Sequence, residues 1–124
     1  MPFTYVFDAA TNIVRTTAHG LVRLDDLTAH LQALIDAGVA NVPQLIDARD
    51  AQHDLPPSDI RRLADFVSGL QAAHGFSRRT ALVVSTLVDF GMARMYGGLA
   101  QKADPDFSVF RDLGEAEAWL QGGR

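Results

Sequence analysis

In the first third of the chain, segments in which every second residue is apolar are followed by a segment in which apolar residues recur at helical spacing. Phe3, Tyr5 and Phe7 alternate with other residues in the way that is typical of a half-buried strand. Turn-forming residues occupy segment 8–12, and segment 13–18 is again extended in pattern. We therefore expect the chain to begin with a β-hairpin.

Two amphipathic helices are expected next. Leucine and other aliphatic residues recur at helical spacing in segments 24–37 and 57–74, and a glycine follows each segment, as suits the position after a last helical turn. Gly20 is expected to break the chain before the first of these helices. Between the two helices, segment 44–47 predicts a short strand, and segment 48–55 predicts a polar connection.

The second half of the chain repeats the same alternation. Segment 80–84 is a β-branched run that leads into a helix over 86–101, and segment 107–110 predicts a last strand before a helix that begins after Asp112. The expected order is β-β-α-β-α-β-α-β-α. This order predicts an α/β fold with a mainly parallel sheet, right-handed crossovers and one domain over residues 1–124.

Composition limits the classes of function. The 124 residues are 48% hydrophobic and carry a net charge of −4, so the chain can bury a normal core and lacks the basic surface that nucleic acids require. The chain contains no cysteine, which excludes disulfides and thiolate chemistry. The N-terminus has no signal-peptide pattern, and no apolar run approaches transmembrane length. We expect a cytoplasmic protein without an integral membrane segment.

Polar residues with catalytic or metal-binding chemistry are few. Asp47, Asp50, His53 and Asp54 follow a predicted strand, where open α/β sheets bind ligands, and three carboxylates with an imidazole can hold a cation. The segment has neither EF-hand spacing nor a histidine pair at i, i+4, and Arg49 among these acids favours an ion-paired, solvated loop. Nucleotide-binding fingerprints and nucleophile–base patterns are also missing from the sequence. We therefore expect no metal, no cofactor, no catalytic residue and no enzymatic activity.

The helix expected over 86–101 carries large apolar residues on more than one face, which exceeds what a single sheet face covers. Methionine adapts to irregular apolar partners, and tyrosine suits sites that are apolar at one end and solvated at the other. One interpretation is that one stripe packs in the core and the other on the next helix. The other is a ligand-binding or interface surface, for which the candidate residues are Phe90, Met92, Met95, Tyr96 and Leu99.

Four segments of the chain carry a family resemblance. They are GLVRLDDL at 20–27, LIDARD at 45–50, DFGMARMY at 89–96 and VFRDLGEAEAWL at 109–120. With them the chain resembles the SpoIIAA-like family of small bacterial proteins, which are related in fold to STAS domains and to CRAL-TRIO lipid-binding domains. The resemblance implies a sheet with helices on its faces. It also implies binding of an apolar or amphipathic ligand, such as a lipid. An extension of that hypothesis is that the protein binds this ligand at a membrane surface.

A regulatory protein-interaction module of the STAS type is the alternative function. Anti-sigma-factor antagonists of that class carry a phosphorylated serine at the start of a helix. Here the corresponding connection contains Ser58, which follows two prolines and lacks the neighbouring Ser-Gly of the motif. A phosphate is physically favourable at a helix N-terminus, while the simpler interpretation is an exposed polar residue in a first turn.

A homodimer is the last expectation from the sequence. A large apolar patch on a soluble domain usually marks an interface, and two-fold pairing is the commonest way to cover one. We expect Phe90, Met92, Met95 or Tyr96 to lie at or beside such a contact, so that Tyr96→Glu would release monomers.

Overall fold

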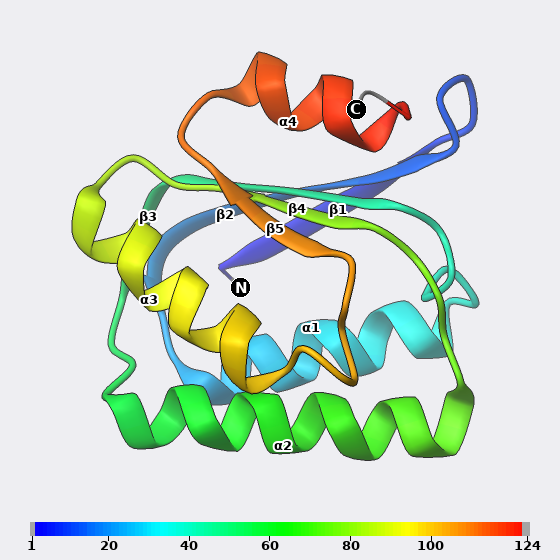
Figure 1. The fold of residues 1–124 in the computed structure, drawn as a ribbon. Coiled ribbons are helices and arrows are strands. Elements are labelled where there is room, and N and C mark those ends of the chain that lie inside the picture. The colour runs from blue at the N-terminus through cyan, green and yellow to red at the C-terminus, as the bar shows by residue number, and fades with distance from the viewer. Residues whose placement is uncertain (1, 123–124) are drawn as a thin grey trace.

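Within residues 2–122, which this computed structural model describes, nine elements follow the predicted order (Figure 1). They are β1 (Phe3–Asp8), β2 (Ile13–Val22), α1 (Leu24–Asp36), β3 (Gln44–His53), α2 (Pro57–His74), β4 (Thr80–Val83), α3 (Leu87–Leu99), β5 (Phe107–Phe110) and α4 (Leu113–Leu120).

The five strands form one mixed sheet in the sequential order β1-β2-β3-β4-β5. The hairpin β1–β2 is antiparallel, and each later pair is parallel. Right-handed crossovers between successive neighbours must all pass over the same face of the sheet. Figure 1 shows this result, because α1, α2 and α3 lie below the sheet and α4, which follows the last strand, lies above it.

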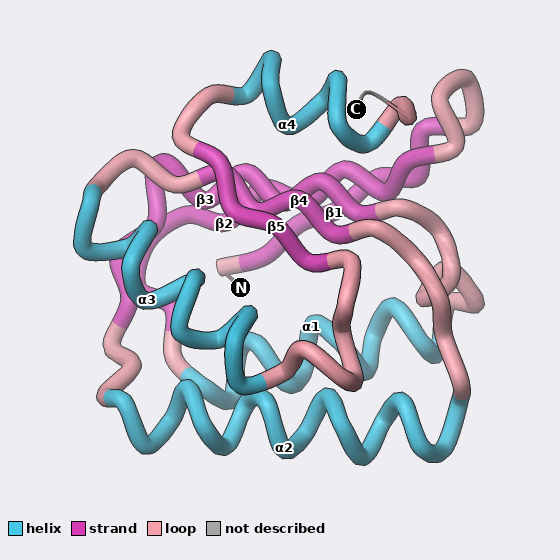
Figure 2. The backbone as a smooth tube through the Cα atoms, viewed as in Figure 1, coloured by secondary structure: helices cyan, strands magenta, loops and turns pink. Residues whose placement is uncertain are grey.

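The strands β2 and β3 are longer than the sequence predicted, and this corrects two expectations. Gly20 does not end the hairpin, and residues 48–53 are not a polar loop, because β2 and β3 stay paired up to Val22 and His53. An irregularity between Thr17 and His19 shifts the register, and Gly20 adopts a positive φ of 73° inside the strand. In Figure 2 these extensions bend away from the rest of the sheet, towards the side on which α1 and α2 lie.

Local signals placed the helix ends correctly to within about two residues. Gly75 takes a left-handed φ of 63° directly after α2. The Thr86 hydroxyl accepts a hydrogen bond of 3.1 Å from the Asp89 backbone N–H at the start of α3. The Asp112 carboxylate caps α4 in the same way.

Buried apolar residues form two separate clusters, one on each side of the sheet. The first joins α2 and α3 and consists of Ile60, Leu63, Ala64, Val67, Tyr96, Ala100 and Ala103. The second joins the sheet to α4 and consists of Ile13, Leu45, Ala81, Val83, Ala116 and Leu120. Phe107 of β5 packs against this first cluster, so α3 meets both α2 and the edge of the sheet, whereas α2 packs mainly on α1 and α3.

Candidate functional site

A cavity of about 180 Å³ lies between the sheet and the helices α1, α2 and α3. Apolar side chains from both layers form most of its wall, with Ala18, Ile46, Leu82 and Phe107 on the sheet side and Leu27, Leu31, Leu63 and Met92 on the helix side. The bent ends of β2 and β3 contribute Val22, Ala51 and His53. The cavity therefore occupies the space between the sheet and the helical core cluster.

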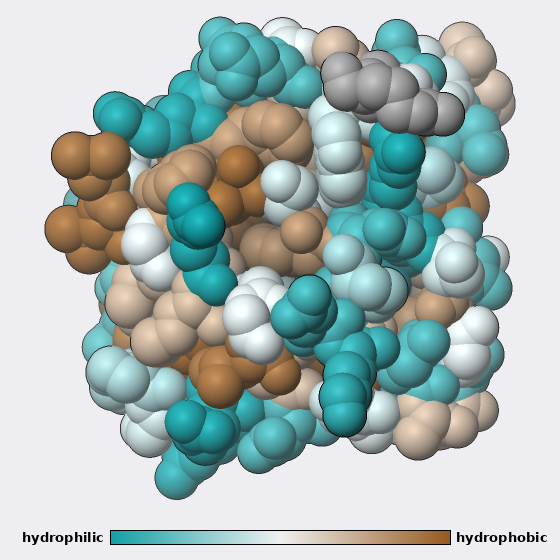
Figure 3. Space-filling view, in the orientation of Figure 1, coloured by the Kyte–Doolittle hydropathy of each residue, from teal (hydrophilic) through white to brown (hydrophobic). Residues whose placement is uncertain are grey.

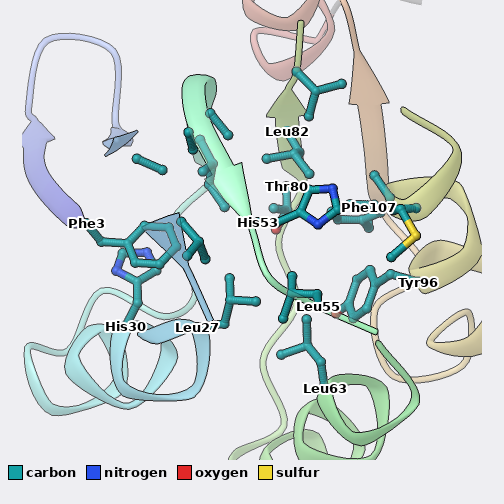
Figure 4. Close-up of a pocket in the computed structure, with 18 of the residues that line it drawn as sticks. Phe3, Leu27, His30, His53, Leu55, Leu63, Thr80, Leu82, Tyr96 and Phe107 are labelled. Atoms are coloured by element: carbon teal, nitrogen blue, oxygen red, sulfur yellow. The ribbon is translucent and has the colours of Figure 1, made fainter. Parts of the chain in front are cut away.

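Two pairs of aromatic rings stand on opposite sides of the cavity, as Figure 4 shows. Phe3 of β1 stacks on His30 of α1, with ring centroids 4.7 Å apart and an interplanar angle of 16°. Across the cavity, Tyr96 of α3 meets Phe107 of β5 edge-on at 4.9 Å and 77°. Stacked and edge-to-face rings are favourable arrangements, so a ring pair packs each side of the cavity.

His30 is a buried imidazole in the wall, with only 7% of its surface exposed. Burial lowers its pKa from 6.5 to about 4, because the charged form loses its hydration. The ring is therefore neutral at pH 7, which suits its stacking on Phe3. Its Nε2 atom has no hydrogen-bond partner among the described residues.

A buried polar pair lies at the end of the cavity nearest the start of β4. The Tyr96 hydroxyl donates a hydrogen bond of 2.9 Å to Oδ2 of Asp104. Burial raises the pKa of the Asp104 carboxyl, while the guanidinium of Arg78 opposes that rise. Burial also raises the pKa of Tyr96, so the phenol stays protonated and acts as the donor.

The opposite end of the cavity reaches the surface at the carboxyl end of β3. The His53 imidazole and the Asp89 carboxylate meet there, with 2.5 Å between Nε2 and Oδ1, and so join β3 to the first turn of α3. Both residues, together with Ala51 and Gln52, also line a shallower depression on the surface beside Arg49. We call this end of the cavity the mouth. Carboxyl ends of parallel strands are the usual place for a ligand to enter an α/β sheet.

Buried polar atoms without partners concentrate around this cavity. Seven buried side-chain nitrogen or oxygen atoms of the described residues make no hydrogen bond, and five of them belong to residues that line the cavity. The five atoms are His30 Nε2, Gln44 Oε1, His53 Nδ1, Arg78 Nε and Thr80 Oγ1. Buried polar groups nearly always have partners in folded proteins, so such a concentration needs a physical explanation.

The acidic cluster noted in the sequence divides in the structure. Arg49 forms an ion pair of 2.8 Å with Asp47, and this hydrogen bonding lowers the pKa of the Asp47 carboxyl. His53 pairs with Asp89 instead of with its sequence neighbours. Among residues 2–122, no three His, Asp or Glu side chains lie close enough to hold a metal ion.

The structure separates the five candidate residues of α3. Met92 and Tyr96 line the cavity, whereas Met95 packs against the helical core cluster. Phe90 is half-buried, and Leu99 is exposed on the surface of the helix. The buried face of α3 is the one that carries Ala93, Tyr96 and Ala100. Because Tyr96 points into the domain, Tyr96→Glu would disturb the interior before it reached any subunit contact.

Several cavity residues were missed in the sequence. The alternating pattern places Phe3 in a strand without indicating a cavity, and the sequence around His30 indicates no role for it. Thr80 begins an otherwise apolar strand, and Gln44 directly precedes the apolar pair Leu45–Ile46; a polar residue at such a position was the available signal for a polar spot on a buried face.

Comparison with known proteins gives the fold and no more. None of the protein-family models matches the chain, and none of the curated proteins does. A solved structure of an uncharacterized protein of the DUF3478 family, from Shewanella loihica, is similar to this chain. The match covers 95% of this chain and 93% of that one, with a TM-score of 0.59 and 20% identity. The fold is SpoIIAA-like. This confirms the expectation drawn from the four sequence segments.

Membrane insertion through a helix has no support in the described part of the chain. None of the helices within residues 2–122 combines the length and the apolar character that a bilayer crossing requires.

Proposed function

We propose that this protein binds a small apolar or amphipathic molecule in the cavity between the sheet and α1–α3, and that it does so without catalysis. The observation that carries the proposal is the cavity itself, an apolar space of about 180 Å³ in the interior of a small domain. Protein interiors are close-packed, and voids of this size are few. A void that costs stability is retained most readily where it has a use.

The volume limits the size of the ligand. An engineered protein cavity of roughly 150 Å³ with aliphatic and aromatic walls binds benzene. The present cavity is of similar size, so it accommodates one aromatic ring or a short branched alkyl group. A whole phospholipid is too large, although the end of a longer chain can enter while the remainder stays at the mouth.

Two exposed apolar side chains beside the mouth support use at a membrane surface. Leu87 and Val88 begin α3 directly before Asp89 and are 72% and 70% exposed. Figure 3 shows apolar side chains projecting at the left edge, where Figure 1 places the start of α3. We expect the double variant Leu87→Ser/Val88→Ser to reduce co-sedimentation with phosphatidylcholine vesicles. If the wild type and the double variant co-sedimented equally, these two side chains would not bind a membrane, and the proposal would no longer include a membrane surface.

Native mass spectrometry of the protein purified without organic solvent tests the binding proposal. We expect a species heavier than the 13.5 kDa chain and a small molecule in the organic extract of the same sample. A matched sample of Ala93→Leu, which narrows the cavity, serves as the control and is expected to carry less of that molecule. A native mass equal to that of the chain alone, with an extract that holds no bound compound, would count against the proposal.

A regulatory interaction module is the second candidate, and the surroundings of Ser58 favour it. Ser58 is exposed in the first turn of α2, and Arg61 and Arg62 follow it at helical spacing. A phosphate on Ser58 would lie at the positive end of the helix and within helical reach of Arg61 and of Arg62, which pairs with Asp59 at 3.5 Å. Phosphomimetic Ser58→Asp and control Ser58→Ala proteins are therefore expected to recover different partners from the native host. Identical recovery by both would contradict this second candidate.

A further inference from the structure

Three polar side chains, those of Gln44, Arg78 and Thr80, line the cavity near the starts of β3 and β4, and we call this its inner end. Gln44 and Thr80 lie opposite each other in the paired strands β3 and β4, and they are only 1% and 4% exposed. Arg78 precedes Thr80 by two residues and also lines the cavity. Thr80 pairs with Phe107 in the register of β4 and β5, and Figure 4 shows it on the other side of the view from the stacked rings of Phe3 and His30.

Each of these three side chains keeps one buried polar atom unpaired. The Gln44 amide uses its Nε2 to donate to the carbonyls of Val39 and Val42, which leaves Oε1 as a lone acceptor. Arg78 leaves Nε–H as a lone donor, and the Thr80 hydroxyl, which can donate or accept, is also unpaired. A group that fits all three atoms must therefore both donate and accept hydrogen bonds.

Charge at this end favours a neutral group. Arg78 brings a cation, but the buried carboxyl of Asp104 lies close enough for the two to influence each other electrostatically. An anionic ligand would gain attraction from Arg78 and suffer repulsion from Asp104, while losing its hydration in an apolar enclosure. The apolar walls suit the body of the ligand, and the polar end suits a head without charge.

We propose that Gln44, Arg78 and Thr80 recognise the head group of a small uncharged ligand, namely a hydroxyl, phenol or primary amide, whose apolar body fills the cavity. This inference rests on the proposed function, because it assigns the ligand class of the same cavity. The head lies at the inner end, and the body points towards the mouth formed by His53 and Asp89.

Toluene and phenol test the inference, because they have nearly the same shape and differ in a methyl or hydroxyl group. Their dissociation constants are to be measured by NMR titration for the wild type, Thr80→Val and Arg78→Lys. Thr80→Val keeps the shape and removes an unpaired hydroxyl, and Arg78→Lys keeps the charge and removes Nε–H. We expect each substitution to raise the dissociation constant of phenol about five- to tenfold and to change that of toluene less than about twofold. Thr17→Val, on an exposed position of β2, is the matched control and should change neither.

The outcomes separate the two proposals. If the dissociation constants of phenol and toluene change equally in both variants, the three polar side chains do not recognise the hydroxyl. The inference is then overturned, while the cavity keeps its binding role. If neither compound binds the wild type, the proposed function fails and the inference fails with it. Benzamide and benzoate test the charge argument, and we expect benzamide to bind about tenfold more tightly. Tighter binding of benzoate would overturn the assignment of an uncharged head.

Discussion

At the scale of single residues, the cavity wall contains ionisable side chains whose protonation is controlled by burial. His30 is the clearest case, because its pKa of about 4 lies well below the value of 6.5 expected in the unfolded chain. Between these two values the unfolded chain binds a proton that the folded chain does not. Acidification through this range therefore favours unfolding.

A substitution of His30 should change how stability depends on pH. We expect the wild type to lose about 3 kcal/mol of unfolding free energy through this group as pH falls from about 6.5 to about 4. His30→Gln should lose correspondingly less over the same range, whatever its stability at pH 7. Urea denaturation at several pH values measures the slope, with exposed His74→Gln as the matched control. A slope in His30→Gln equal to that of the wild type would show that His30 is not buried as described.

The hydrogen bond between Tyr96 and Asp104 should stabilise the fold measurably. Tyr96→Phe leaves the buried carboxyl of Asp104 without its 2.9 Å partner, and we expect a loss of about 1–3 kcal/mol in unfolding free energy. Tyr5→Phe, on the edge strand β1, removes an exposed hydroxyl and should cost little. Chemical denaturation of both variants near neutral pH provides the comparison, and equal stability of the two would contradict the role given to this pair.

At the scale of elements, α3 joins the mouth of the cavity to its polar inner end. Thr86→Ala removes the side-chain cap of this helix, and we expect a loss of about 1 kcal/mol with faster amide hydrogen exchange in the first turn. Thr86→Ser keeps the hydroxyl and is expected to stay close to the wild type. If Thr86→Ala exchanged no faster than Thr86→Ser, the cap would have no part in holding the mouth.

The same scale explains what the sequence could and could not predict. Periodicity and end signals such as Gly75 and Thr86 are local, so the order and class of the elements followed from them. The pairing of residues 19–22 with 50–53 is not local, and the polar sequence of the second segment concealed it. Met92 and Tyr96 were identified as candidates, because a helix that is apolar on several faces needs extra cover.

At the scale of the whole molecule, the cavity exists because α2 packs mainly on α1 and α3 and not on the sheet. An apolar stripe has the same sequence pattern whether it meets a sheet or lines a space, so periodicity contained no sign of the hollow. Val22, Ala51 and His53 of the extended, bent pair β2–β3 line it on one side. Binding in this cavity is the central claim.

Saturable binding of toluene, followed by NMR in the wild type and in Ala93→Leu, tests that claim most directly. Ala93 is buried in the cavity wall, and leucine places an isopropyl group in the space that toluene would take. Ala33→Leu, on the exposed side of α1, adds the same group outside the cavity. We expect toluene to bind the wild type and Ala33→Leu and to lose its binding in folded Ala93→Leu. No saturable binding by the wild type, or equal binding by Ala93→Leu, would contradict the claim.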